Sequence, residues 1–262
     1  IVGAGFMARG LANQLANSAR GIRLAAISNR RVERARDAFD FAGRDDAVVA
    51  ESQASLDAAI ESGKPVATSD ALLLARCPHI DALVEVTGSV EFAAHVLLEA
   101  FRHGKHVLLM NAELDGTIGP ILQTYAARHG VVLSAADGDE PAMLINLLRW
   151  VKGIGMTPRL LGNAKGLQDR YRTPATQQAY AEQWGQNVQM VTSFADGTKI
   201  NFEQAIVANA SGFGVLSRGM SRGRPLARDV TSIGMDYDLD ALRRLGGAVD
   251  YVTNSPTAKI FC

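Results

Sequence analysis

Short apolar runs alternate with helical patterns through the first half of the chain, and this alternation constrains the fold more than any other feature. The runs are nearly continuous, as in strands buried on both faces, while the segments between them repeat apolar residues at helical spacing. The expected strands cover residues 1–2, 22–28, 65–69, 82–88, 106–111 and 131–136. The expected helices cover residues 7–19, 31–43, 52–63, 70–76, 90–103 and 117–129. The alternation predicts an α/β fold with a parallel, doubly wound sheet.

The pattern changes after residue 140, which predicts a first domain over 1–140 and a smaller α+β domain over 141–262. A strong helix carries Pro141 in its first turn. Residues 166–187 are polar and predict an exposed loop with one short helix. The pair Asp196-Gly197 turns a hairpin or separates two helices, and the four-residue apolar step that follows favours two helices.

Composition limits the classes of partner and the compartment. The 262 residues, 47% of them hydrophobic, suffice for one large or two modest domains. A net charge of +0 gives no reason to expect nucleic acid or a membrane surface as partner, and no apolar run approaches the roughly 18 residues of a membrane span. Cys77 and Cys262 are too far apart for a disulfide framework or a metal-ligand spacing, which favours the cytoplasm. The chain starts without methionine and ends inside an expected strand, so we expect further residues at both ends and a further domain after Cys262.

A glycine motif follows the first strand, in the order Gly3, Ala4, Gly5, Phe6, Met7, Ala8. In this pattern Gly3 allows a tight turn, Gly5 allows backbone to approach a pyrophosphate, and the small Ala8 lets helix pack on strand. The helix amino terminus adds free N–H groups and a positive dipole end. Because strand, turn, helix and second strand come in the required order, the motif predicts dinucleotide binding in a Rossmann domain.

The second strand ends where an NAD site would carry an acidic residue, and here that place holds Ser28, Asn29, Arg30 and Arg31. Guanidinium groups pair with a 2′-phosphate, which a carboxylate would repel, so we expect NADP, with NAD as the alternative. The alternative is that the two arginines are only solvated residues at the start of a helix.

Three further residues are assigned to the cofactor at the carboxyl ends of the fourth and fifth strands. Thr87 and Gly88 end the fourth strand, where such sheets present backbone to the nicotinamide end of the cofactor, and Asn111 ends the fifth. A plain helix cap at Ser89 is compatible with this assignment.

Four segments together resemble the homoserine dehydrogenase-like oxidoreductases, which often carry a C-terminal SAF domain and include 1-deoxy-D-xylulose 5-phosphate reductoisomerase-like enzymes. The segments are "GAGFMARG", "HGKHVLLMNAELDGTIGPIL", "AADGDEP" and "MVTSFADGTKINFEQAIVANASG". The resemblance implies an NADP-dependent enzyme with a Rossmann domain and a smaller catalytic domain, assembled as a dimer or larger homo-oligomer. One departure concerns the proton-handling lysine, because the family carries it just past the fifth strand, where this chain has Asn111-Ala112-Glu113.

Hydride transfer to a carbonyl requires an acid or cation near the oxygen on which negative charge develops. Lys165, at the end of an expected strand over 159–166, is our candidate for that acid and base, although a surface lysine at a strand end is the alternative. Glu113 follows the fifth strand, on the edge where such sheets bind ligands, and is assigned to the substrate.

Three acids crowd the loop after the sixth strand, namely Asp137, Asp139 and Glu140. Three acids so close together repel one another unless a cation compensates their charge. They bind a hydroxylated substrate, a divalent metal or Lys165, or they only cap the next helix. We assign Asp139 and Glu140 to substrate orientation and no residue to a metal, because the spacing fits no metal signature. Loop arginines that would close over a phosphorylated substrate, if they are not simply solvated, are Arg170, Arg172, Arg222 and Arg224.

Taken together, the residues predict an NADP-dependent oxidoreductase that acts on a small polar carbonyl or hydroxy compound. One alternative is a reductoisomerase in which a divalent ion holds the substrate oxygens. A second alternative is a regulatory protein that binds NADP without turnover. Neither nucleic acid nor membrane is an expected partner.

Overall fold

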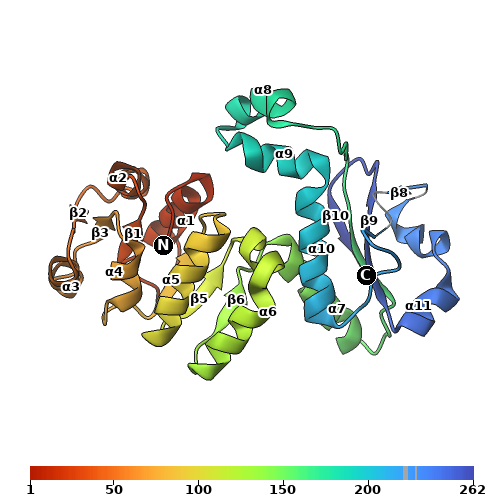
Figure 1. Cartoon of the computed structure of the whole chain (residues 1–262), viewed down its shortest axis with the longest axis horizontal. Helices are drawn as coiled ribbons and strands as arrows, with labels where there is room; N and C mark the ends of the chain where they lie inside the picture. Colours follow the sequence, from red (N-terminus) through yellow and green to blue (C-terminus); the bar gives the residue numbers. More distant parts are fainter. Residues whose placement is uncertain (221–223, 228) are drawn as a thin grey trace. The chain divides into compact units, whose positions relative to one another are not determined.

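A computed structural model describes residues 1–220, 224–227 and 229–262 of the chain (Figure 1). These residues form two compact units, Ile1–Ala136 and Asp137–Cys262. No helix within the described residues combines the length and the apolar character that a membrane crossing requires.

The first unit is built on a parallel sheet. Its strands are β1 (Ala26–Ser28), β2 (Val48–Val49), β3 (Val66–Thr68), β4 (Ala82–Glu85), β5 (His106–Leu109) and β6 (Leu133–Ala135). They pair as β1-β3-β2 and β4-β5-β6, and Val2 joins the two sets by bridging in parallel to Ser28 and to Glu85. The chain therefore leaves its first strand at the point where the strand order reverses, which is where open α/β sheets bind ligands.

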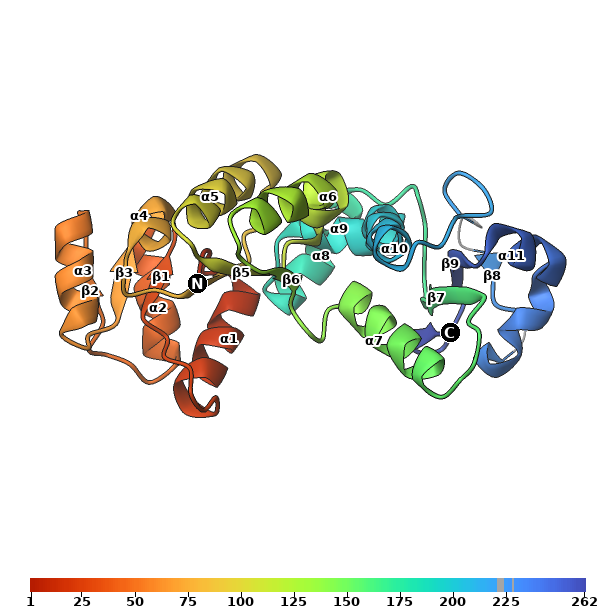
Figure 2. The ribbon, with the colours of Figure 1, turned by 90° about the horizontal axis from the view of Figure 1, so that it is seen from below.

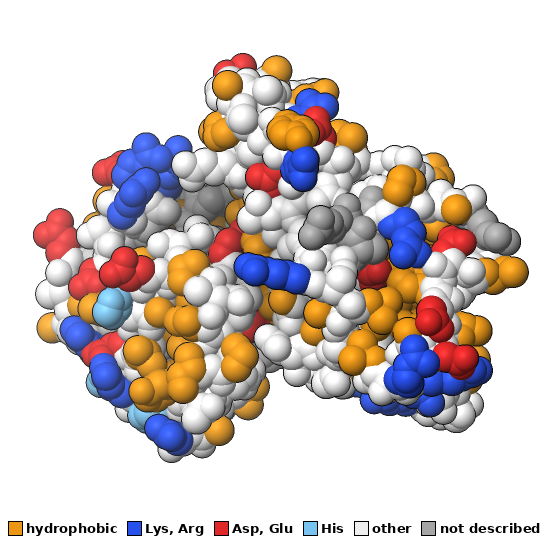
Figure 3. Space-filling model, turned by 45° about the vertical axis from the view of Figure 1, so that its right-hand side comes forward, with side chains coloured by type: hydrophobic (Ala, Val, Ile, Leu, Met, Phe, Trp, Pro, Cys, Tyr) orange, Lys and Arg blue, Asp and Glu red, His pale blue; other side chains and the backbone are white. Residues whose placement is uncertain are grey.

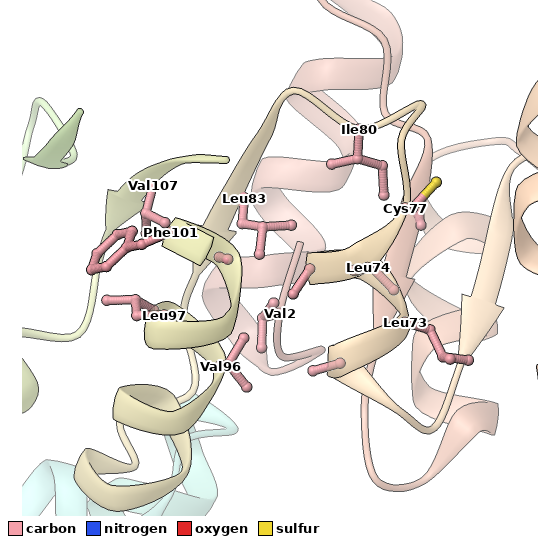
Figure 4. Close-up of a cluster of buried hydrophobic side chains, with 14 of the residues drawn as sticks. Val2, Leu73, Leu74, Cys77, Ile80, Leu83, Val96, Leu97, Phe101 and Val107 are labelled. Atoms are coloured by element: carbon pink, nitrogen blue, oxygen red, sulfur yellow. The ribbon is translucent and has the colours of Figure 1, made fainter. Parts of the chain in front are cut away.

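Helices cover both faces of this sheet, which confirms the doubly wound fold. They are α1 (Phe6–Asn17), α2 (Val32–Phe41), α3 (Gln53–Glu61), α4 (Ala71–Arg76), α5 (Val90–Arg102) and α6 (Ala112–Arg128). One buried cluster joins α1 and α2 to Ile27 and Ala67. The larger cluster joins helices α3 to α6 to Ala26 and Val66, the strand neighbours whose side chains point to the opposite face. Figure 4 shows part of this cluster, in which Leu74 of α4 and Leu97 of α5 lie near Leu83 of β4.

Two elements of the first unit differ from the sequence expectation. The short strand β2 lies between α2 and α3, where the sequence analysis placed no strand. Helix α6 begins at Ala112, five residues before the expected start, because the Asn111 side chain accepts a hydrogen bond from the Leu114 N–H and caps it.

The second unit contains a four-stranded mixed sheet and six helical elements within its described residues (Figure 2). The strands are β7 (Leu160–Ala164), β8 (Arg224–Pro225), β9 (Ala248–Thr253) and β10 (Lys259–Phe261), in the order β10-β7-β9-β8. Strand β10 is antiparallel to β7, and the other pairs are parallel. The helical elements are α7 (Glu140–Gly153), α8 (Pro174–Trp184), α9 (Val188–Asp196), α10 (Thr198–Ser211), the 3-10 helix η1 (Val230–Asp236) and α11 (Leu239–Leu245).

Successive residues of the central strands β7 and β9 pack against different helices. Leu161 and Val249 pack with α7 and α10, whereas Leu160 and Ala248 pack with η1 and α11. The expectation of two helices around Asp196-Gly197 is confirmed, because Gly197 takes a φ of +92° and ends α9 directly before α10. Strand β9 was not expected, since Asp250 interrupts its apolar run.

Candidate functional site

The glycine turn has the geometry that a dinucleotide requires. Gly3 takes a φ of +108°, and a Cβ at this position would lie 3.1 Å from Val86 Cγ2 and 3.3 Å from the Val86 carbonyl carbon. Gly5 is the N-cap of α1, and a Cβ there would meet nothing within 4 Å. The first turn of α1 has neither a side-chain cap nor an acidic residue. Its N–H groups are therefore left for an external anion.

The remaining motif residues divide between packing and exposure. Ala8 is fully buried against the sheet, as the motif requires. Phe6 and Met7 begin the helix with more than half of each side chain exposed. The first unit thus offers an open turn at the switch point of its sheet, which fits a pyrophosphate.

At the end of β1 the structure places a buried hydroxyl and two exposed cations. Ser28 is buried, and its Oγ has no hydrogen-bond partner among the described residues. The Asn29 side chain accepts a hydrogen bond from the Arg31 N–H at 3.0 Å. The guanidinium groups of Arg30 and Arg31 are exposed and make no ion pair with a described residue. The end of β1 thus carries a hydroxyl and two exposed guanidinium groups, and no acid.

A buried carboxyl lies at the end of β4. The Thr87 N–H donates to Glu85 Oε1 at 2.8 Å, and the Thr87 hydroxyl donates to the same oxygen. Burial raises the pKa of Glu85, against the effect of hydrogen bonds from Thr87 and Asn111. Thr87 is thereby fixed, and Gly88 follows it with a φ of +69°. The sequence did not single out Glu85, although an acid inside an apolar strand was the available signal.

Asn111 and Glu113 lie at the start of α6. Asn111 is buried, and its Nδ2 donates to the Ser89 carbonyl at 3.3 Å in addition to its capping bond. The Glu113 carboxylate is half-buried in the first turn, close enough for its charge to raise the pKa of Glu85. Asn111 and Glu113 therefore lie near the buried Glu85 carboxyl of the first unit. Their contacts with a ligand remain predictions.

The acids at the start of α7 separate into different roles. Asp139 is the N-cap, and its side chain accepts from the Glu140 N–H. Asp137 Oδ1 accepts from the Gly138 N–H and from Asn146 Nδ2 at 2.9 Å. Across the described parts of the chain, no group of three or more His, Cys, Asp or Glu residues is arranged to hold a metal ion.

Lys165 meets the third of these acids. Its Nζ donates to both carboxylate oxygens of Glu140, at 2.9 and 3.0 Å, while its main-chain N–H bonds to the Val252 carbonyl beside β9. Of the partners that the sequence left open for the acidic cluster, Lys165 is therefore the one that Glu140 contacts. The lysine is part-buried and fixed at the end of β7.

Two residues of α10 complete this cluster, which comprises Lys165, Glu140, Glu203 and Lys199. Glu203 is almost fully buried, and its Oε1 lies 3.3 Å from Lys199 Nζ. Burial is the largest cause that raises the pKa of Glu203 to about 8; a hydrogen bond with Glu140 adds to it, and the charge of Lys199 opposes it. The cluster thus brings two carboxyls and two ammonium groups together from α7, β7 and α10.

An open cavity of about 440 Å³ lies beside the cluster. Its lining includes Glu140, Glu203 and Lys259, together with Gly138, Met143, Ala258 and Ile260. Two buried amides lie nearby: Asn163, two residues before Lys165 on the same face of β7, and Gln204, next to Glu203. Neither side-chain amide has a hydrogen-bond partner among the described residues, so both retain capacity for water or ligand.

The loop arginines already have partners. Arg170 stacks on the Tyr171 ring, Arg172 pairs with Asp169 at 3.0 Å, and Arg224 donates to the Asp236 carbonyl. Arg222 lies outside the described residues. Near Arg172, helices α8 and α9 also expose hydrophobic side chains, which gather at the α8 end of the molecule (Figure 3); Tyr180 and Trp184 are among them.

Sequence reasoning found Lys165 and Glu140 but missed Glu203, Lys199, Asn163 and Gln204. A signal for Glu203 and Gln204 existed, because they share a helical stripe with buried Ile200 and Val207. Polar residues on such a stripe are rare unless they are paired or functional.

Models of known domain families match both units. The model of "Homoserine dehydrogenase, NAD binding domain" matches residues 3–131, and that of "Oxidoreductase DRL, catalytic domain" matches residues 138–262. Each match covers just under half of the chain, so residues 3–131 resemble an NAD-binding domain and residues 138–262 resemble an oxidoreductase catalytic domain.

The comparison with solved structures gave matches at low identity, and the first one named here shares the fold. A scyllo-inositol dehydrogenase from Lactobacillus casei, solved with NAD(H) and scyllo-inositol, has a TM-score of 0.51 and 15% identity over 89% of this chain and 61% of that chain. A UDP-N-acetylglucosamine 3-dehydrogenase from Acidithiobacillus ferrooxidans has a TM-score of 0.48 and 17% identity, over 82% and 56% of the two chains. An NAD binding oxidoreductase from Klebsiella pneumoniae has a TM-score of 0.45 and 18% identity, over 66% and 43%. The chain spans less than two thirds of each of these structures. A comparison with curated proteins gave no match.

Proposed function

We propose that this chain is an NADP-dependent, homoserine dehydrogenase-like oxidoreductase that interconverts a small polar carbonyl compound and its hydroxy form. The observation that carries the proposal is the pair of Lys165 and Glu140, with Nζ to oxygen distances of 2.9 and 3.0 Å. The pair lies beside an open cavity, in the unit that matches an oxidoreductase catalytic domain.

In this proposal the bound nicotinamide supplies or accepts the hydride. The Lys165 ammonium polarises the carbonyl oxygen and gives a proton to the alkoxide that forms during reduction. In the oxidative direction the neutral amine accepts the hydroxyl proton. Glu140 restricts Lys165 to one position, which removes the conformational search of a free lysine side chain. Asp139 and Glu113 are the proposed substrate-orienting acids.

The preference for NADP is supported by the donors at the end of β1. Arg30 and Arg31 have no ionic partner among the described residues, and the buried Ser28 hydroxyl lacks a hydrogen bond. A charge-assisted hydrogen bond contributes about 1.5–3 kcal/mol. Two such bonds to a 2′-phosphate would therefore give a large preference for NADP(H) over NAD(H).

Replacing both arginines tests the cofactor. We expect the Arg30→Ala/Arg31→Ala variant to lose about a hundredfold or more in NADPH affinity while its NADH affinity changes little, because only NADPH carries the 2′-phosphate. Binding is measured by titration calorimetry at constant salt. Arg20→Ala, which removes another exposed arginine of the first unit, serves as the charge control. A wild-type protein that binds NADH more tightly than NADPH contradicts the assignment.

Replacing the lysine tests the chemistry. We expect Lys165→Ala to lower kcat by about 10²–10⁴-fold, the usual contribution of a positioned acid or base, with the Kd for NADPH unchanged. The matched control is Lys152→Ala at the exposed end of α7, which should keep full activity. Unchanged turnover of Lys165→Ala would remove this residue from the reaction.

The substrate panel separates the proposal from its alternatives. NADPH oxidation is followed with aspartate semialdehyde and with 1-deoxy-D-xylulose 5-phosphate, each with and without magnesium or manganese. Metal-dependent turnover of the sugar phosphate alone would favour a reductoisomerase. Saturable NADPH binding with no oxidation across a broad carbonyl panel would favour a cofactor-sensing protein.

A further inference from the structure

Glu140 lies between a lysine and a second carboxyl. Both of its oxygens accept hydrogen bonds from Lys165 Nζ, and Glu203, which lines the same cavity, is near enough for Glu140 to raise the pKa of the Glu203 carboxyl. The Lys199 ammonium lies on the far side of Glu203, at 3.3 Å. The four side chains therefore form a chain of contacts, Lys165 to Glu140 to Glu203 to Lys199.

A hydrogen bond between two carboxyl groups requires a proton on one of them, because an ionised carboxylate has no donor. Glu203 is the better holder of that proton. Its side chain is 3% exposed, against 19% for Glu140, so ionisation costs more at Glu203. Both oxygens of Glu140, in turn, accept hydrogen bonds from Lys165 Nζ.

We propose that Glu203 is a positioning residue that holds a proton shared with Glu140 and returns it to Lys165 during turnover. The proposal rests on the function proposed above, in which Lys165 handles the proton of the substrate oxygen. In the reductive direction the substrate oxygen takes one proton from Lys165, and the resulting amine takes one proton from the carboxyl pair. The pair, left with two negative charges, recovers one proton from water in the cavity that both glutamates line.

The electrostatic surroundings of Glu203 support this assignment. Burial raises the pKa of Glu203 to about 8, with contributions from Glu140, while Lys199 and Lys165 act in the opposite direction. Other titratable groups on elements that pack around α10 include Lys259 on β10, Tyr251 on β9, whose hydroxyl contacts Gln168 and Asn201, and Asp196 on α9, which accepts from the Thr198 N–H. Strand β9 also carries Asp250, which accepts from the Tyr237 hydroxyl, and α7 carries Arg149, which donates to Asn146, and Lys152 in its last turn. No hydrogen bond or ion pair is described between these side chains and the Glu203 carboxyl.

The first test observes the proton directly and needs no substrate. In protein labelled with ¹³C at the glutamate carboxyl carbons, we expect one resonance to titrate with a midpoint near pH 8 and to be absent from Glu203→Gln. Glu182→Gln, an exposed glutamate of α8, is the control and should keep the resonance. Lys199→Met should move the midpoint upward, because Lys199 favours the ionised form. A wild-type spectrum in which every glutamate titrates in the ordinary range overturns the proposal.

The second test is kinetic and separates this inference from the function on which it rests. We expect Glu203→Leu to lower kcat about tenfold or more with an unchanged Kd for NADPH, and Glu203→Gln to recover part of that loss, since an amide still donates to Glu140. The pH profile of kcat should lose its limb near pH 8 in Glu203→Gln. If the limb near pH 8 remains in Glu203→Gln, the role of Glu203 is refuted while the proposed function stands. If the wild type shows no turnover, the proposed function is refuted, and the carboxyl titration alone decides whether Glu203 holds the shared proton.

Discussion

Gly3 shows how much a single residue determines in the cofactor turn. Its φ of +108° is costly for any residue with a side chain, and a Cβ there would make a tight contact, 3.1 Å, with Val86 just after β4. The same sequence motif contains Gly5, whose Cβ would meet no atom of the protein. The two glycines therefore serve different needs: Gly3 serves the fold of the turn, and Gly5 leaves open space for a ligand.

Gly3→Ala is expected to destabilise the protein by more than about 1–2 kcal/mol, the cost of a left-handed conformation, because a close contact with Val86 is added. NADPH affinity should fall about tenfold or more as the turn shifts. Urea unfolding and cofactor titration measure the two effects. Gly21→Ala is the control, since Gly21 also has a positive φ of +76° but no atom lies within 4 Å of its Cβ. Equal effects of the two variants would show that the contact with Val86 does not matter.

At the scale of elements, helix α10 contributes residues both to the hydrophobic core of the second unit and to the cluster around Lys165. Val207 of this helix packs with Leu161 and Val249, while Glu203, one turn earlier, meets Glu140 of α7. The same helix therefore buries an acid that a solvent-exposed helix would leave ionised. The stability of the fold must then depend on the protonation of that acid.

The sign of this pH dependence follows from the raised pKa. The folded protein binds the Glu203 proton more tightly than the unfolded chain, so the stabilisation is complete below pH 4.5 and is lost as the pH rises to about 8. We expect the unfolding midpoint of wild type to fall across this window relative to Glu203→Gln, which has no proton to lose. Thermal unfolding at a series of pH values measures the difference. Parallel curves for the two proteins would contradict the assignment.

Element boundaries could be predicted where local signals act and not elsewhere. The strands β3 to β6 and the pair α9 and α10 follow from apolar runs and from Gly197. Strand β9 could not be recognised, because Asp250 is accommodated there by the buried hydroxyl of Tyr237, which donates to it at 2.9 Å, and by the Tyr251 N–H. Tertiary partners of this kind override local pattern.

At the scale of the whole molecule, the two units divide the proposed work. The glycine turn, Ser28 and the two free arginines all belong to residues 1–136, whereas Lys165 and its cluster belong to residues 137–262. A cofactor that binds the first unit should therefore stabilise that unit by mass action.

Hydrogen exchange tests this division in the intact chain. With NADP⁺ at a hundred times its Kd, the binding unit gains about 2.7 kcal/mol, so global exchange of β1, β4 and β5 should slow about a hundredfold. Peptides from the α1 start and the end of β1 should show the earliest protection. Mass spectrometry of the exchanged protein provides the measurement, with NAD⁺ at the same concentration as comparison. Protection confined to β7, β9 and α10 would contradict the placement of the cofactor.

The sequence by itself determined the α/β alternation, the open glycine turn and the absence of an acid at the end of β1, because each depends on residues close together in the chain. It also put forward Lys165 and Glu140 separately. Only the tertiary structure joined them, since 25 residues separate the two and the bond exists because β7 ends beside the start of α7. The role of Glu203 was likewise decided by tertiary structure, because the burial that raises its pKa arises only when α10 packs on that sheet.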